Sequence, residues 1–171
     1  MTHYLSYLLI LGLLIWPAVS NSQNKLIAFY DIEECAYGFK NEQNIIVINP
    51  RFKKVKGFIK EGLCQVMLNE NWGLINKKGE FIVSPVLDEI WNFHPKYMVV
   101  PAKKNNRWGF INKSGKWTIS PKYKNIAYAQ KGYFEKSPFL FIVQKNELNG
   151  IVSSSGKEIL APKLDRFRKI Q

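Results

Sequence analysis

The sequence is poor in the residues on which most catalytic and metal sites depend. It has two histidines and two cysteines among 171 residues, and 13 acidic residues against 25 lysines and arginines. Only His94 lies outside the first 24 residues, so Ser/His or Cys/His catalysis would have to use it. A metal site needs several converging ligands, which this set does not indicate. We therefore predict a non-enzymatic protein without catalytic, cofactor-binding or metal-binding residues.

Charged side chains are absent from residues 1–24. Residues 8–16 form an apolar run that Pro17 interrupts, and Ala18, Val19 and Ser20 then give the small-x-small pattern of a cleavage site. The run is too short to span a bilayer comfortably. We predict a signal peptide over residues 1–20, a single domain over 21–171, and export to the periplasm, the cell surface or the medium. The alternative is an uncleaved segment that anchors the chain to a membrane.

One unit recurs four times after this segment, starting near residues 37, 72, 108 and 149. Residues 72–85 align with 108–121 without a gap. Each unit has a leading position, a glycine directly after it, a turn residue and a proline. The structural repeat positions are Tyr37, Gly38, Trp72, Gly73, Gly79, Trp108, Gly109, Gly115, Gly150 and Gly156, with Pro50, Pro85, Pro121 and Pro162.

The unit has the pattern of a β-hairpin. A short apolar strand leads to a turn such as residues 76–79, whose glycine tolerates the positive φ of a hairpin loop. Asn44 takes this place in the first unit, and asparagine is the second choice for that backbone. We expect the proline to end the return strand, and the leading Trp ring to lie over the neighbouring glycine.

A further strand is expected before each unit, over residues 26–29, 63–68, 98–100 and 139–143. The chain is then offset by one strand at each end. These elements predict an all-β fold, a tandem array of about four three-stranded β-hairpin repeats forming an open arc or solenoid. The alternative is a small propeller-like closure. A single hairpin buries little apolar surface, and stacked hairpins bury more.

The pattern Trp-Gly-Phe-Ile-Asn-Lys-x-Gly, followed by apolar residues and Pro-x-Tyr, resembles the WG-repeat proteins. Residues 37–171 fit it, with Tyr37 and Asn149 replacing Trp in the outer copies. The resemblance implies a β-hairpin array, most often on exported or surface bacterial proteins. It implies no shared catalytic residues.

Cys35 and Cys64 form an even pair, so a disulfide is permitted in an oxidising compartment. Their offsets from the following leading positions differ by six residues, which corresponds to about 20 Å along a strand. Two thiols are therefore favoured over a bridge, and both possibilities remain open.

Basic residues follow the proline in several units, and the net charge is +12. Stacking would align these positions into one ridge, which we call the basic ridge and predict to contact polyanions. Its residues are Arg51, Lys53, Lys54, Lys56, Lys122, Lys124, Lys163, Arg166 and Arg168. Asp88 and Glu89 interrupt it in the second unit, and lysines that protect exposed strand edges from aggregation are the alternative explanation.

These features favour a monomeric, exported binding or scaffold module that contacts a protein or an anionic polymer of the cell envelope, without a cofactor. A membrane surface is a further possible partner. The alternatives are an enzyme or accessory domain acting on envelope glycans, and a nucleic-acid-binding protein. The predicted export signal argues against nucleic acid as the partner.

Overall fold

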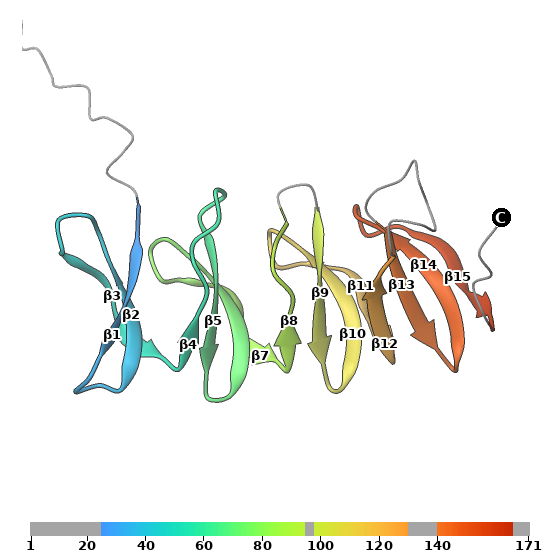
Figure 1. Ribbon diagram of the computed structural model, residues 1–171, viewed down its shortest axis with the longest axis horizontal. Coiled ribbons are helices and arrows are strands. Elements are labelled where there is room, and N and C mark those ends of the chain that lie inside the picture. Colours follow the sequence, from blue (N-terminus) through green and yellow to red (C-terminus); the bar gives the residue numbers. More distant parts are fainter. Residues whose placement is uncertain (1–24, 95–97, 130–139, 166–171) are drawn as a thin grey trace, which may run out of the picture.

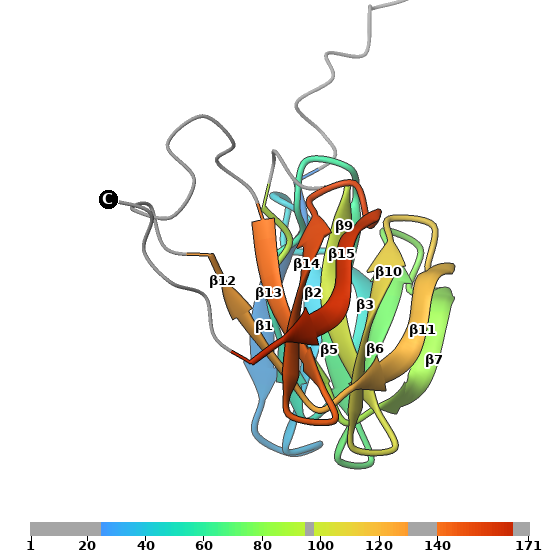
Figure 2. The same cartoon turned by 90° about the vertical axis from the view of Figure 1, so that its right-hand side faces the viewer.

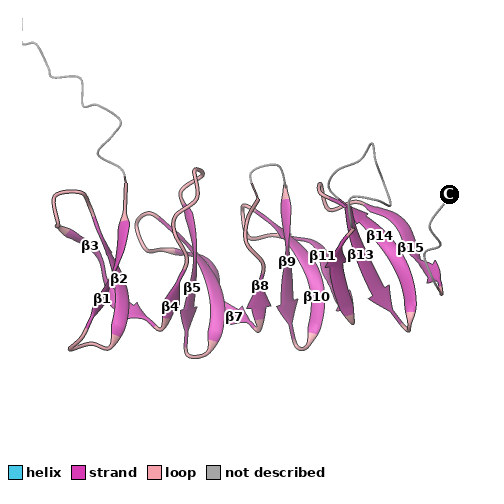
Figure 3. Cartoon of the chain, viewed as in Figure 1, coloured by secondary structure: helices cyan, strands magenta, loops and turns pink. Residues whose placement is uncertain are grey.

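The computed structural model describes residues 25–94, 98–129 and 140–165. The predicted leader and the ridge residues Arg166 and Arg168 lie outside this part of the chain. The described residues are all-β, without a helix (Figure 3). They form four antiparallel sheets that follow one another along the longest axis (Figure 1), stacked behind each other in the end view (Figure 2). The first and last sheets lie at opposite ends, so the array is open and the predicted fold class is confirmed.

Each sheet is an antiparallel meander in chain order. The first sheet has β1 (Ile27–Asp31), β2 (Ala36–Lys40) and β3 (Ile46–Phe52). The second has β4 (Lys54–Val55), β5 (Leu63–Leu68), β6 (Asn71–Asn76) and β7 (Phe81–Leu87). The third has β8 (Glu89–Ile90), β9 (Val99–Lys104), β10 (Arg107–Asn112) and β11 (Trp117–Tyr123). The fourth has β12 (Asn125–Tyr128), β13 (Leu140–Lys145), β14 (Leu148–Ser153) and β15 (Glu158–Leu164).

The last three sheets thus contain one strand more than the three predicted. The short strands β4, β8 and β12 lie between the repeated proline and the further strand of the next unit, where the sequence analysis placed no strand. Their apolar residues Val55, Ile90 and Ile126 are paired with Val66, Ala102 and Val143.

The repeated proline was expected to end the return strand, but the strand continues past it. β7 continues through Pro85 to Leu87. The pairing changes from Trp72↔Leu87 to Leu74↔Val83, so two extra residues form a bulge around the proline. A bulge leaves backbone N–H positions unpaired, so proline fits there without the loss of a ladder hydrogen bond.

The glycine of the Trp-Gly pair faces this bulge. A Cβ added at Gly109 would lie 2.5 Å from the Ile119 carbonyl oxygen and 2.8 Å from the Pro121 nitrogen. The corresponding distances at Gly73 are 2.8 and 3.1 Å. The backbone of the return strand therefore requires the glycine, and the atoms nearest to the added Cβ are those of this strand, not of a Trp ring.

The turn glycines join neighbouring repeats. Gly79, Gly115 and Gly156 have φ between 77° and 81°, and Asn44 has φ 61°, which confirms the predicted positive-φ position. A Cβ at Gly115 would lie 2.6 Å from a methyl carbon of Val83 in the preceding sheet. Each turn glycine after the first unit therefore allows both the hairpin turn and close approach of two sheets.

An asparagine holds the same turn. The Asn112 side-chain oxygen accepts hydrogen bonds from the backbone N–H groups of Ser114 and Lys116, at 3.1 and 2.9 Å. Asn41 and Asn76 make the same pair of contacts in the first two units. Side-chain oxygens of this kind replace backbone acceptors in tight turns.

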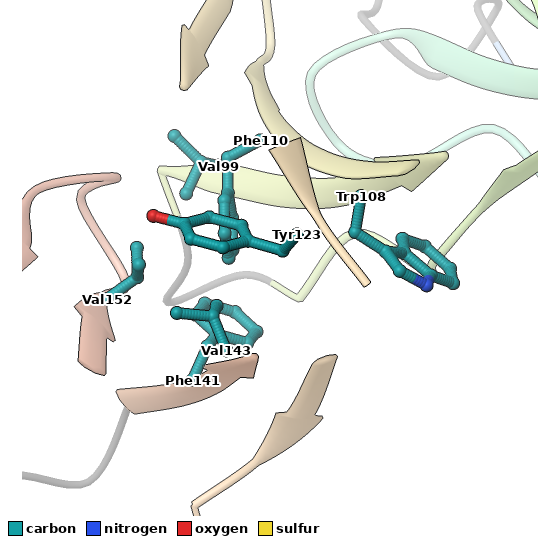
Figure 4. Packing of buried hydrophobic residues seen from close by; sticks show 7 residues of the cluster. All are labelled: Val99, Trp108, Phe110, Tyr123, Phe141, Val143 and Val152. Atoms are coloured by element: carbon teal, nitrogen blue, oxygen red, sulfur yellow. The ribbon is translucent and has the colours of Figure 1, made fainter. Parts of the chain in front are cut away.

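The core consists of layers between successive sheets. Figure 4 shows the layer in which Phe110 and Tyr123 of the third sheet face Phe141, Val143 and Val152 of the fourth. The Phe110 and Phe141 ring centroids are 5.0 Å apart. Each sheet therefore depends on its neighbours for burial, as in other repeat arrays.

The two tryptophans of the strong repeats occupy equivalent settings. Trp108 is buried against the third-to-fourth layer, and Trp72 packs against the second-to-third layer. Trp91 lies against the Trp108 ring, with centroids 5.7 Å apart. Lys56, at the same offset from its proline, lies over the Trp72 ring at 5.0 Å. Equivalent sequence positions thus lie at equivalent places in space.

The two cysteines lie in different environments. Cys35 is exposed in the turn between β1 and β2, whereas Cys64 is buried in β5, and both are free. Burial raises the pKa of the Cys64 thiol to about 12.

Candidate functional site

Several residues of the predicted basic ridge bind groups of the protein itself. The Arg51 guanidinium donates a hydrogen bond to the Gly79 carbonyl at 2.8 Å and lies over the Phe52 ring at 5.0 Å. The Lys56 ammonium donates to the Asn92 side-chain oxygen at 2.6 Å, and burial lowers its pKa. These two cations join neighbouring repeats, and they do not form an open anion-binding surface.

Other ridge residues belong to a repeated contact with the tight turn of the next sheet. Lys53 pairs with Glu70, which lowers the pKa of that exposed carboxyl. Lys124 pairs with Glu147 at the corresponding turn, at 2.6 Å. In the second unit Asp88 stands at this position and accepts a hydrogen bond from the Asn106 backbone N–H at 2.8 Å. The acidic interruption of the ridge therefore follows from the turn residue opposite it.

The structure brings part of the ridge together with residues that the sequence analysis did not select. A groove of about 360 Å³ lies where the third sheet meets the fourth, and we call it the basic groove. Its cations come from β10, β11, β13 and the segment between β11 and β12. It is lined by Arg107, Lys122, Lys124, Lys145, Asn146 and Glu147.

Two of the four cations in the basic groove have carboxylate partners. Lys122 pairs with Glu158 at 2.9 Å, and Lys124 pairs with Glu147. Among the described residues, Arg107 and Lys145 form neither an ion pair nor a side-chain hydrogen bond. Two positive charges in the groove are therefore available to a ligand.

Glu158 binds Lys122, one of the cations that line the basic groove. It accepts hydrogen bonds from the Tyr123 hydroxyl and the Lys122 ammonium, and these contacts hold the pKa of its carboxyl below the usual range. Burial and the same carboxylate raise the pKa of the Tyr123 phenol. The Lys122 ammonium is thus positioned by a partly exposed contact between the third and fourth sheets.

Only some of the equivalent positions at the other junctions are basic. Asn71 and Ala36 correspond to Arg107, each at the position before its leading aromatic, and Val86 and Arg51 correspond to Lys122. Asp88 and Lys53 correspond to Lys124, and Lys104 and Leu68 correspond to Lys145. Lys54 and Lys163 are exposed outside the lining of the basic groove. Among the described residues, the junction of the third and fourth sheets is therefore the one at which all four positions are basic.

A second hollow region lies at the opposite edge of the array, between the loops that follow β4 and β8. It has two parts, of about 310 and 410 Å³, which share Ile59 and Phe93 as walls. His94 lines the first part, beside Glu61 and Lys113, which form an ion pair.

In the part of the chain that the structure describes, no group of three or more His, Cys, Asp or Glu side chains could hold a metal ion. The same part contains no helix long and apolar enough to cross a membrane.

The repeat itself decides the family. A model described as WG containing repeat matches three consecutive segments, residues 37–72, 72–108 and 108–148. The chain belongs to this family. This match confirms the resemblance of the sequence to the WG-repeat proteins. The glycine of each Trp-Gly pair is the residue that faces the proline-containing bulge of its hairpin. The fourth sheet follows the same meander as the second and third, and its last strand, β15, lies beyond the matched segments.

Comparison with solved structures found "KlHsv2 with loop 6CD replaced by a Gly-Ser linker", at 8% identity and a TM-score of 0.40. The match covers 80% of this WG-repeat chain and 45% of that chain. The chain therefore spans less than half the length of that structure. A search of curated proteins found no match.

Proposed function

We propose that this WG-repeat chain is a non-enzymatic binding module of the cell envelope that holds an anionic polymer in its basic groove. The observation that carries the proposal is the convergence of Arg107, Lys122, Lys124 and Lys145 on one groove between two sheets. Two of these cations, Arg107 and Lys145, form no ion pair with another described residue. Like charges held together repel each other, so a bound polyanion would relieve that cost.

The shape of the site supports a polymer as the ligand. The groove is formed by the ends of strands and a tight turn at the outside of the array. A chain molecule can place successive anionic groups against Lys145 and Arg107 and continue along the surface. Charge-assisted contacts of this kind are strong when the anion is held by several donors.

The carboxylates near the groove support a binding role over hydrolysis of glycans. General acid and base catalysis needs two carboxyl groups that face a substrate and exchange protons with it. Glu147 and Glu158 are instead bound to Lys124 and Lys122. The contacts of Glu158 hold the pKa of its carboxyl below the usual range, which suits a structural role for this acid.

A direct test measures the binding of fluorescent dextran sulfate by anisotropy at low and moderate salt, with neutral dextran as the ligand control. The test variant is Arg107→Ser with Lys145→Ser. The matched control is Lys78→Ser with Lys116→Ser, which removes the same charge from exposed positions in hairpin turns at the opposite edge.

We expect the test variant to bind at least about tenfold more weakly, which corresponds to about 1.4 kcal/mol, and to show a weaker salt dependence. The control should stay within about twofold. Equal losses in both variants, or binding that salt does not affect, would contradict the proposal. Stronger binding of short duplex DNA than of dextran sulfate would favour nucleic acid as the ligand.

The envelope location rests on the leader. The apolar run over residues 8–16 and the small residues before position 21 support cleavage and export. Measuring the mass of the protein recovered from culture medium and from envelope fractions tests both the cleavage and the export. A chain that begins after Ser20 is expected, and a full-length chain in the cytoplasm would contradict export.

A further inference from the structure

The larger part of the hollow region between the loops after β4 and β8 has both polar and apolar walls. We call this part, of about 410 Å³, the amide pocket. It shares no lining residue with the basic groove. Small-molecule sites have volumes of about 300–1,000 Å³, so the amide pocket is large enough for a small ligand. It is lined by Lys56, Gly57, Ile59, Gln65, Asn92 and Phe93.

Gln65 is a buried polar side chain with one unused hydrogen-bonding atom. It is 4% exposed on β5, at the register that Pro101 and Ile142 occupy in β9 and β13. Its Nε2 donates a hydrogen bond to the Trp91 carbonyl oxygen at 2.5 Å, and its Oε1 accepts none from a described residue. Every fully buried side-chain oxygen or nitrogen of the described residues has a partner, so this Oε1 must be accessible. The amide pocket therefore contains a fixed acceptor for a ligand.

Lys56 and Asn92 supply donors to the same pocket. The Lys56 ammonium donates to Asn92 Oδ1 at 2.6 Å and to the Ile90 carbonyl oxygen at 3.3 Å, which leaves one of its three N–H groups. It forms no ion pair with a described carboxylate. Asn92 Nδ2 donates to no described residue. A partly buried positive charge and an amide donor thus lie side by side.

Two aromatic rings occupy the equivalent place at the next junction. Lys56 and Trp91 each lie six residues after the repeated proline, and Asn92 and Tyr128 each lie seven residues after it. The Trp91 and Tyr128 ring centroids are 4.7 Å apart, whereas Lys56 and Asn92 make the equivalent contact as a hydrogen bond. Burying polar groups costs stability unless they are bonded. Polar residues at this one junction therefore indicate a ligand that bonds to them.

The groups of the amide pocket define the chemistry of that ligand. A carboxylate can accept hydrogen bonds from the Lys56 ammonium and Asn92 Nδ2 together, and such charge-assisted bonds are strong. A hydroxyl can donate to Gln65 Oε1. The Phe93 and Ile59 side chains give an apolar wall for the C–H face of a ring. A sugar that carries a carboxyl group combines all three features in one ring.

We propose that the amide pocket binds one uronic acid unit, with its carboxylate at Lys56 and Asn92 and a ring hydroxyl at Gln65. The adjoining part of the hollow region shares Ile59 and Phe93 as walls, so it gives space to the next unit of a sugar chain. This site reads one sugar ring, whereas the basic groove holds a polyanion by several cations. The two sites therefore act independently.

The amide pocket is tested by titrating the full chain with methyl β-D-glucuronide and following the side-chain amide signals of Gln65 and Asn92 by NMR. Methyl β-D-glucoside has the same ring without the carboxylate, and acetate has a carboxylate without the ring. We expect saturation near about 1 mM, the scale for a ligand of about 14 non-hydrogen atoms. Both controls should bind at least about tenfold more weakly. No binding of the glucuronide, or equal binding of either control, would overturn the proposal.

Two variants change the pocket in different ways. Lys56→Trp with Asn92→Tyr copies the aromatic pair of the next junction, so it fills the space and keeps a side chain over the Trp72 ring. Asn92→Asp keeps an acceptor for Lys56 and replaces the amide donor with a negative charge. The matched control is Gln43→Glu, which makes the same change from amide to carboxylate at an exposed turn of the first sheet.

We expect both test variants to bind methyl β-D-glucuronide at least about tenfold more weakly, and the control to stay within about twofold. Circular dichroism checks that the double variant folds. Asn92 is exposed, so Asn92→Asp decides the matter if the double variant does not fold. Binding by Asn92→Asp that equals binding by Gln43→Glu would contradict the proposal.

Further measurements separate this site from the basic groove. Arg107→Ser with Lys145→Ser should bind methyl β-D-glucuronide within about twofold of the wild type, and Asn92→Asp should bind dextran sulfate within about twofold. Loss of glucuronide binding in the Arg107 and Lys145 variant would place the carboxylate in the basic groove and overturn the proposal. Tighter binding of N-acetyl-phenylalanine than of the glucuronide would assign the amide pocket to a peptide C-terminus and would also overturn it.

Discussion

Replacement of Gly109 with alanine tests the bulged hairpin that all four repeats share. The added Cβ would lie 2.5 Å from the Ile119 carbonyl oxygen, 2.8 Å from the Pro121 nitrogen and 2.9 Å from the Ser120 carbonyl carbon. These neighbours are backbone atoms, so a change of rotamer cannot relieve the overlap. Overpacking costs about 1–3 kcal/mol when side chains can move, and here β11 itself must shift away from β10.

We therefore expect Gly109→Ala to lower the free energy of unfolding by about 3 kcal/mol. In a chain of this length such a loss lowers the Tm by roughly 6–12 °C. Urea and thermal unfolding followed by circular dichroism measure both quantities.

Gly57→Ala is the matched control for the same measurement. A Cβ added at Gly57 meets no atom within 4 Å, and its φ is not in the left-handed region. Its free energy of unfolding should stay within about 0.5 kcal/mol of the wild type. If Gly109→Ala unfolds like Gly57→Ala, the bulge does not constrain this glycine and the explanation of the Trp-Gly pair is wrong.

Three further outcomes follow from contacts in the fold. Asn112→Ala removes the acceptor of two backbone N–H groups in its turn and should cost about 1–2 kcal/mol in urea unfolding, so an unchanged midpoint would contradict the role of the turn. Hydrogen bonds to the Glu158 carboxylate, first of all the one from Tyr123, lower the pKa of Glu158 from 4.5. The ionised carboxylate therefore stabilises the fold above pH 4.5, and this stabilisation is lost as the pH falls through the lower pKa of the folded state. Glu158→Gln should flatten the loss of stability between about pH 5 and 3, whereas an unchanged acid limb in pH-dependent unfolding would contradict this assignment. In the reduced, folded protein one thiol, exposed Cys35, should react rapidly with a disulfide reagent, and buried Cys64 should react only after unfolding; two fast thiols, or none, would refute this.

The parts of the fold that the sequence predicted are those in which the backbone restricts the choice of residue. Gly79 and Gly115 recur because the hairpin turn needs a positive φ. The asparagine at φ 61° in the first unit obeys the same requirement. Such positions can be read from one sequence because few residue types satisfy them.

The role of the proline could not be read in the same way. Proline in a strand indicates either its end or a bulge, and the choice depends on the strand opposite. The glycine after the leading aromatic was the available signal, since it stands opposite Pro85 and Pro121 in the folded hairpins. The short strand β4 was missed because two paired residues leave no periodic pattern.

The basic groove was predicted only in part. Lys122 and Lys124 were selected because they follow the repeated proline. Arg107 and Lys145 were not selected, because each lies beside a tight turn: Arg107 follows the turn at Asn105 and Asn106, and Lys145 precedes the turn at Asn146. Asn105, Asn106, Asn146 and Glu147 have positive φ, typical of two-residue hairpin turns. An asparagine-led turn that follows a lysine was the signal that could have brought these cations together.

The claim that one junction of the array binds an anionic polymer is tested most directly by amide NMR of the protein titrated with a short dextran sulfate. We predict chemical-shift changes concentrated at Arg107, Lys122, Lys124 and Lys145, saturating with one affinity. Shifts of similar size at exposed lysines on other sheets, such as Lys25 and Lys78, would show that the positive charge acts without a site and would contradict the account.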